Sequence, residues 1–140
     1  MTREAIEALF ARRREANSRQ DAAALAGDYA PDCVVESPSA GVHRGRTAVE
    51  QVIRALFDAL DLEVHEESLL IDGDAAAQVV TLEGTDSGQF LGLPPTGKSF
   101  RIPAVLLYDF KDGKIVRERR VFDFTGLLVQ IGLLKAKPSV

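Results

Sequence analysis

The sequence predicts an α+β domain in which a curved antiparallel sheet wraps around one long helix. Three observations carry this prediction. Helical spacing of apolar residues dominates up to residue 60, alternation with a period of two dominates from residue 62 to 124, and tight-turn sequences at 72–74 and 112–113 join the later strands. Because one helix cannot fill the concave face of such a sheet, we expect a cone-shaped barrel with an apolar pocket.

The helices are predicted from caps and apolar spacing. Thr2 stands in an N-cap position before an apolar stripe, and the arginines at 12–14 fan around this first helix, which is typical of a solvated face. The clearest helix covers 47–60, where apolar residues recur with helical spacing behind a possible capping box of Thr47 and Glu50.

The remaining elements are shorter helices and long strands. Short helices are predicted between Asp21 and Gly27 and near the C-terminus, from residue 127 to 134. Strands are predicted over 33–35, 62–71, 75–85, 100–110 and 114–124. Pro103 interrupts the fourth of these and indicates a bulge or an edge position. The long loop over 87–97 carries apolar residues that we expect to gate the pocket or to cover a partner subunit, Phe90 among them.

Composition excludes several classes of protein. The 140 residues suffice for a single domain over 1–140, and 17 Lys and Arg against 21 Asp and Glu argue against nucleic-acid binding. One cysteine, Cys33, excludes an internal disulfide and a multi-thiolate metal site, and two histidines exclude a three-histidine zinc site. No apolar run has the length of a membrane span and no signal-peptide pattern is visible, so we expect a cytoplasmic protein without a membrane partner.

Carboxylates are the best candidates for acid/base chemistry, because the sequence contains no phosphate-binding loop and no nucleophile elbow. Asp123 stands between two phenylalanines at the end of the last strand, where desolvation would raise its pKa toward neutrality. The alternative is that Asp123 caps the C-terminal helix. Strand alternation places Arg119, Val121 and Asp123 on one face and Glu118, Arg120 and Phe122 on the other.

Other polar residues are candidates of lower rank. Glu83 is the second carboxylate, although it could instead form a structural ion pair with Arg119 across the sheet. Tyr29 and Tyr108 could each donate a hydrogen bond to an oxyanion, or could simply pack as amphipathic side chains. The two histidines, His43 and His65, are interpreted as exposed residues.

Several segments resemble the SnoaL-like polyketide cyclases. They are 29–32 (YAPD), 84–98 (GTDSGQFLGLPPTGK), 112–116 (DGKIV), Phe122-Asp123 and 126–132 (GLLVQIG). The resemblance covers about the whole chain and is strongest from 84 to 132. It implies the nuclear-transport-factor-2-like cone around a deep apolar pocket, and a homodimer formed through the sheet. The same cone hosts cyclases, ketosteroid isomerases, epoxide hydrolases and binding proteins.

The resemblance also implies a mechanism without metal or cofactor, in which an aspartate on the last strand acts as the general acid/base of an aldol-type closure. Asp123 falls at that place, with Arg119 or Tyr108 as donors for the developing oxyanion. Tyr29, Glu83, Phe90, Leu106 and Val121 are then expected to contact the ligand. The chain departs from the family pattern at four positions: it has Asp86 for a common histidine, Arg119 for a tryptophan, Arg120 for a frequent acidic residue and Leu106 for a polar one.

Three functions follow as alternatives. The first is a cofactor-independent cyclase, lyase or isomerase acting on a small hydrophobic carbonyl compound. The second is a non-catalytic carrier of a hydrophobic ligand. The third is an epoxide hydrolase of the limonene type, whose last-strand motif resembles 119–123 (RRVFD), although Glu83-Gly84-Thr85 replaces its earlier arginine and aspartate partners.

Overall fold

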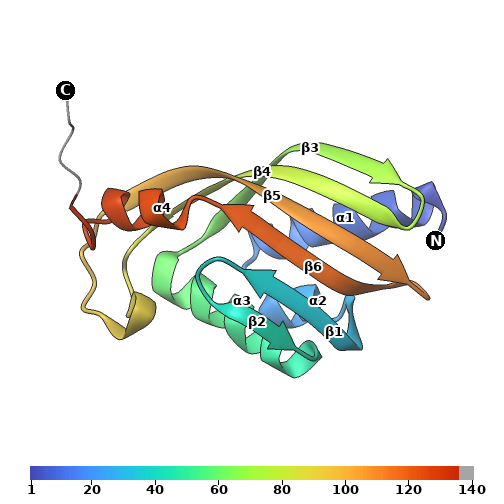
Figure 1. Ribbon diagram of the computed structural model, residues 1–140, viewed down its shortest axis with the longest axis horizontal. Helices are drawn as coiled ribbons and strands as arrows, with labels where there is room; N and C mark the ends of the chain where they lie inside the picture. The colour runs from blue at the N-terminus through green and yellow to red at the C-terminus, as the bar shows by residue number, and fades with distance from the viewer. Residues whose placement is uncertain (136–140) are drawn as a thin grey trace.

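The structure is a computed structural model that describes residues 1–135. A six-stranded mixed sheet forms one layer, and helices cover one of its faces (Figure 1). The elements, in chain order, are α1 (Arg3–Ser18), α2 (Ala22–Ala26), β1 (Tyr29–Ser37), β2 (Gly41–Arg44), α3 (Arg46–Leu60), β3 (Glu63–Asp72), β4 (Ala75–Thr85), the 3₁₀ turn η1 (Phe90–Gly92), β5 (Ser99–Lys111), β6 (Lys114–Phe122) and α4 (Phe124–Gln130).

The sheet has the strand order β2-β1-β6-β5-β4-β3. The predicted meander is confirmed from β3 to β6, because each strand pairs antiparallel with the next one in sequence. The expectation of a purely antiparallel sheet is wrong at one place, where β1 pairs parallel with β6. The α+β class and the curved sheet around a long helix are confirmed, and the cone-shaped barrel is open, because its sheet does not close on itself.

The caps of the helices agree with the sequence at most positions. Thr2 accepts a hydrogen bond from the Ala5 amide, and Asp21 accepts one from the Ala24 amide. The long helix is confirmed, but its predicted capping box is wrong. Helix α3 begins at Arg46 behind Gly45, which takes a positive φ of 92° and makes no side-chain cap bond.

Two features of the strands differ from the prediction. The expected short strand at 33–35 is the centre of the nine-residue β1, and β2 follows it, so His43 lies on a strand. Pro103 lies inside β5 opposite Thr81, but pairing with β6 begins only at Ala104. Pro103 therefore flanks the end of the β6 ladder, which agrees with the expected edge position.

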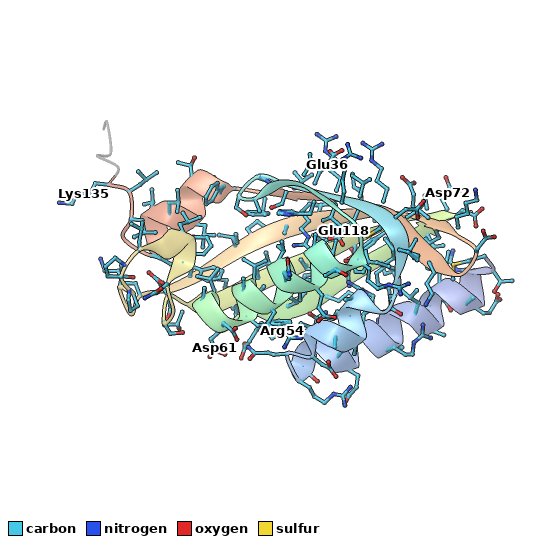
Figure 2. The ribbon with its side chains drawn as sticks, turned by 90° about the horizontal axis from the view of Figure 1, so that it is seen from below. Glu36, Arg54, Asp61, Asp72, Glu118 and Lys135 are labelled. Atoms are coloured by element: carbon cyan, nitrogen blue, oxygen red, sulfur yellow. The ribbon has the colours of Figure 1, made fainter. Side chains whose placement is uncertain are left out.

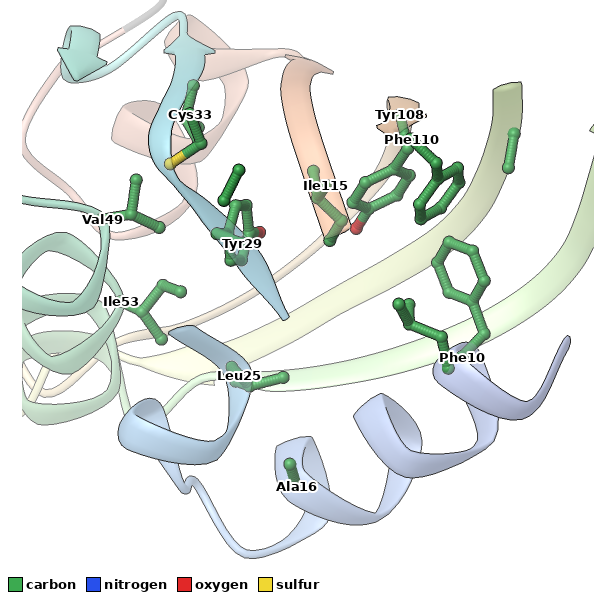
Figure 3. Packing of buried hydrophobic residues seen from close by; sticks show 14 of the residues in the cluster. Phe10, Ala16, Leu25, Tyr29, Cys33, Val49, Ile53, Tyr108, Phe110 and Ile115 are labelled. Carbon is green, nitrogen blue, oxygen red and sulfur yellow. The ribbon is translucent and has the colours of Figure 1, made fainter. Parts of the chain in front are cut away.

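The core consists of two hydrophobic clusters between the sheet and the helices. The larger one joins α1, α2 and α3 to β1, to the end of β5 and to the start of β6. Within it, the Phe10 ring packs edge-on against Tyr108 and Phe110, which stack on one another (Figure 3). The smaller cluster joins the end of α3 to η1, α4 and the start of β5. At Gly84 a Cβ would collide with the Leu60 carbonyl oxygen, so glycine lets α3 end directly against β4.

No helix within residues 1–135 is long and apolar enough to cross a membrane.

Candidate functional site

A cavity lies between the concave face of the sheet and helix α3, at the junction of the two hydrophobic clusters, and its volume is about 100 Å³. Most of its wall is apolar and is supplied by residues such as Ile53, Phe57, Leu82, Ile102, Leu106 and Phe122. The polar part of the wall includes Arg13, Gln78, Tyr108, Glu118 and Arg120. An apolar wall with a few convergent polar groups is the usual composition of a small-molecule site.

Glu118 is the centre of the polar part. It stands on the inner face of β6 with an exposed fraction of 1%, and it lies between the sheet and α3 (Figure 2). Its Oε2 accepts a hydrogen bond from Arg120 Nε at 2.7 Å, and its Oε1 accepts one from the Tyr29 hydroxyl. Since a carboxylate offers about four lone-pair sites, both oxygens retain acceptor capacity toward the cavity.

Arg13 connects α1 to this group. Its guanidinium donates to the Leu25 carbonyl at 3.0 Å, to Asp28 Oδ2 at 3.3 Å and to the Tyr29 hydroxyl at 3.1 Å. It also lies over the rings of Tyr29 and Tyr108, at 5.1 and 5.9 Å from their centroids. Arg13 therefore fixes the hydroxyl that binds Glu118, and it adds a positive charge to the buried end of the cavity.

Tyr108 reaches the cavity from β5. Its hydroxyl donates to Gln78 Oε1 at 3.3 Å, and Gln78 in turn donates to Glu66 Oε1 at 3.0 Å. The hydroxyl oxygens of Tyr29 and Tyr108 turn toward one another (Figure 3). Burial raises the pKa of both phenols, so each stays protonated at neutral pH and remains a hydrogen-bond donor.

The charge state of Glu118 results from two opposing effects. Burial raises the pKa of its carboxyl group, but the positive charges of Arg120 and Arg13, together with hydrogen bonds from Arg120 and Tyr29, outweigh burial. The pKa therefore lies below the ordinary value of 4.5, and the carboxylate is ionised at neutral pH.

This shift predicts a pH dependence of stability. Because folding lowers the pKa of Glu118, its ionised form stabilises the folded state above about pH 4.5, and that contribution is lost as the pH falls through the lowered pKa. The free energy of unfolding is measured with urea for the wild type and for Glu118→Gln. We expect the difference between the two proteins to be constant from pH 6 to 8, and the stability advantage of the wild type to shrink below about pH 4.5. A difference that already changes between pH 6 and 7 would contradict the lowered pKa.

Three of the residues expected at the ligand line the cavity. They are Tyr108 and Leu106 on β5 and Phe90 on η1. Phe90 is buried, whereas Leu91 and Leu93 of the same loop are exposed. The loop therefore places only Phe90 against the cavity.

Asp123 is not in the cavity, and the expectation that it is desolvated among aromatic side chains is wrong. It is exposed, it precedes α4, and its Oδ1 accepts a hydrogen bond from the Gly126 amide at 2.8 Å. This is the capping role that the sequence left open as the alternative.

Arg119 and Val121 share the outer face of β6 and are exposed. The expectation that they contact a ligand in the cavity is therefore wrong. The predicted division of residues 118–123 between two faces of β6 is confirmed, but both of these candidates lie on the solvent face. The residues 119–123 that resemble the epoxide-hydrolase motif are consequently divided between the two sides of the sheet.

Glu83 and Tyr29 also lie outside the cavity wall. Glu83 pairs with Arg101 at 3.2 Å and lies 3.6 Å from His65, so the ion pair expected with Arg119 does not form. Tyr29 has no exposed surface and supports Glu118 from behind the wall. Its hydroxyl thus orients a cavity residue and does not itself line the cavity.

The sequence did not lead us to predict Glu118, Arg120 and Arg13 as site residues. A signal existed for each. Glu118 and Arg120 alternate with Phe122 on the apolar face of the last strand, and Arg13 follows Ile6, Leu9 and Phe10 at helical spacing. Charged residues that continue an apolar face are candidates for burial in pairs.

The comparisons with known proteins agree with this fold. The profile of the family described as SnoaL-like polyketide cyclase matches residues 8–131. The nogalonic acid methyl ester cyclase of Streptomyces nogalater is 32% identical over 94 residues, which are 66% of this chain and 70% of that protein. The structure of TsrD from Streptomyces laurentii has a TM-score of 0.83 at 25% identity and covers 96% of this chain and 99% of TsrD. The structure of AclR from Streptomyces galilaeus has a TM-score of 0.79 at 28% identity, and the match covers 95% of this chain and 88% of AclR.

Proposed function

Because this chain belongs to the SnoaL-like polyketide cyclase family, we propose that it catalyses cofactor-independent acid/base chemistry on a small hydrophobic carbonyl compound held in the cavity. The reaction is an aldol-type cyclisation or an isomerisation. One observation carries the assignment of the base: among the residues that line the cavity in the described chain, Glu118 alone bears a carboxylate.

Glu118 removes a proton from the carbon next to the carbonyl group. The electron pair of the broken C–H bond forms the enolate, and negative charge develops on the carbonyl oxygen. The guanidinium of Arg120 stands beside Glu118 and stabilises this charge, with the Tyr108 hydroxyl as a second donor on the same wall. The enolate then attacks a second carbonyl, whose oxygen takes up the proton held by Glu118 as the new C–C bond forms, or it is reprotonated at another carbon by Glu118.

The apolar wall supports the same reaction. Ile102, Leu106 and Phe122 exclude water from the inner face of the sheet, which strengthens the interaction between the guanidinium and the enolate oxygen. Tyr29 holds Glu118 in one orientation from behind the wall, and Arg13 fixes the Tyr29 hydroxyl. They are positioning residues, because neither supplies or accepts the transferred proton.

Deuterium exchange tests this function without knowledge of the physiological substrate. The full chain is incubated in D₂O with 2-acetylnaphthalene, a hydrophobic methyl ketone, and loss of the methyl proton signal is followed by NMR. We expect exchange that is faster than in buffer and proportional to protein concentration. A carrier would bind the ketone without accelerating exchange, and an epoxide hydrolase would convert limonene oxide into its diol; either result in place of exchange contradicts the proposal.

We further propose that the protein acts in the cytoplasm as a homodimer formed through the outer face of the sheet. Leu70, Leu107 and Val121 are exposed there, and Leu107 lies in register between Ala77 and Arg119. The apolar row is bordered by opposite charges, among them Asp109 and Arg117, which lie opposite one another on neighbouring strands. A two-fold interface can pair such a surface with itself.

Replacing Leu107 by glutamate should convert the dimer into a monomer, because it places a charge in the middle of the apolar row. Light scattering coupled to size-exclusion chromatography measures the mass. Val42→Glu is the matched control, since Val42 is also an exposed apolar residue but lies on the edge strand β2, three strands away from β5. A monomeric wild type, or a dimer that survives Leu107→Glu, would contradict the proposal.

A further inference from the structure

Arg120 has an open edge. Its side chain lies on the inner face of β6, has an exposed fraction of 12% and lines the cavity. One edge of the guanidinium is used, because Nε donates to Glu118 Oε2 at 2.7 Å. Among residues 1–135, no hydrogen bond involves its two terminal nitrogens.

The terminal nitrogens of Arg120 are not fully buried. Within the described chain, only His43 Nε2 and Asp86 Oδ1 are side-chain atoms that are both fully buried and without a hydrogen-bond partner. The unpartnered ends of Arg120 must therefore keep accessible surface. Since the residue lines the cavity, that surface faces a ligand held there.

The open donors at the cavity suit an acceptor group on a ligand. Each arginine of the wall already faces one carboxylate, because Arg13 pairs with Asp28 and Arg120 pairs with Glu118. Arg13 has no free donor edge, because it binds the Leu25 carbonyl, Asp28 and Tyr29. The donors available to a ligand are consequently the terminal nitrogens of Arg120.

We propose that the ligand of this cavity carries a carboxylate, which the two terminal nitrogens of Arg120 bind end-on, while its hydrophobic body lies against Leu106 and Phe122. This deepens the proposed function by naming a group on its substrate. The planar guanidinium fork matches a carboxylate with two parallel hydrogen bonds, which a neutral ester cannot form as well. Glu118 occupies the other edge of the same guanidinium, so the bound carboxylate and the base stand on different sides of Arg120.

Isothermal titration of the full chain with 2-naphthoate and with methyl 2-naphthoate at pH 7.5 tests this inference. The two probes share one carbon skeleton and differ in the charge of one group. We expect the wild type to bind the acid at least about tenfold more tightly than the ester, in line with a charge-assisted bidentate pair. Equal affinities, tighter binding of the ester, or binding of neither probe would overturn the proposal, and this comparison needs no variant.

Variants locate the effect. Arg120→Gln should remove the preference for the acid, and Arg120→Lys, which keeps the charge beside Glu118 but lacks the fork, should leave a smaller preference. Arg119→Gln is the matched control, because the neighbouring arginine is exposed on the outer face and should retain the wild-type preference. Circular dichroism verifies that each variant is folded. A preference lost equally in Arg119→Gln and Arg120→Gln would contradict the assignment.

Failure of this inference is separable from failure of the proposed function. Titration measures binding alone, and deuterium exchange measures proton transfer. A preference for the acid without any ketone exchange supports the carboxylate site and overturns the acid/base function. Ketone exchange without a preference for the acid supports the acid/base function and overturns the carboxylate site.

Discussion

Replacing Glu118 by glutamine is expected to slow deuterium exchange into a bound ketone by at least about 100-fold, because a positioned general base contributes roughly 10² to 10⁴ to the rate. Glutamine has nearly the shape of glutamate, and its one carbonyl oxygen can still accept from Arg120 while its NH2 group faces the Tyr29 hydroxyl, but it cannot take up the proton. The affinity for 2-acetylnaphthalene should change little, since the apolar wall supplies most of its contacts. NMR measures the rate and the affinity on one sample.

Glu118→Asp gives a graded control for this result. The carboxylate is kept but withdrawn by one methylene, so we expect a rate between those of the wild type and the glutamine variant. If Glu118→Gln exchanges the ketone at the wild-type rate while it remains folded, Glu118 is not the base, and the proposed function loses its central residue.

Replacing Arg13 by methionine is expected to lower the free energy of unfolding by about 3–5 kcal/mol, the range found when one partner of a buried ion pair is removed. The side chain of Arg13 is 7% exposed and that of Asp28 is 14% exposed. Loss of the guanidinium removes the hydrogen bonds that Arg13 donates to Asp28 Oδ2, to the Leu25 carbonyl and to the Tyr29 hydroxyl. Urea denaturation followed by circular dichroism measures the change.

Arg12 provides the matched control for this prediction. It is the preceding residue, it also contacts Asp28, at 3.4 Å, but its side chain is 64% exposed. Arg12→Met should therefore change stability by less than about 1 kcal/mol, as is usual for exposed pairs. Similar losses of unfolding free energy in Arg12→Met and Arg13→Met would show that burial of Arg13 does not strengthen its contribution to stability.

Local signals in the sequence were sufficient for most elements. Thr2 caps the helix that it was expected to cap, Asp21 stands at the predicted start of the second helix, and the turns at 72–74 and 112–113 join antiparallel strands as predicted. These features depend on residues close together in the chain. The parallel pairing of β1 with β6 depends on contacts across about 80 residues, and no local pattern specifies it.

The site was harder to predict for a related reason. Alternation divides β6 into two faces but does not say which face meets the helices, because both faces carry apolar and charged residues. A register shift between Asp109 and Phe110 brings Ile115 into the core although Arg117 and Arg119 are exposed. A strict alternation from Ile115 therefore favours the wrong face.

Arg13 shows the same difficulty on a helix. Three consecutive arginines indicate a solvated face, and Arg12 and Arg14 are indeed exposed. Arg13 is buried because its position continues the stripe of Ile6, Leu9 and Phe10, and because Tyr29 and Asp28 supply partners that only the folded chain brings near. Burial of a charge depends on such partners, which the helix sequence alone does not contain.

A comparison of two carboxylates decides most directly where the proton is transferred. The rate of deuterium exchange into 2-acetylnaphthalene is measured for Glu118→Gln and for Asp123→Asn at equal saturation; asparagine preserves the helix cap, so the second variant keeps its fold. We predict that exchange is lost in Glu118→Gln and unchanged in Asp123→Asn. Exchange that survives in Glu118→Gln and disappears in Asp123→Asn would move the chemistry out of the cavity to the exposed end of the last strand.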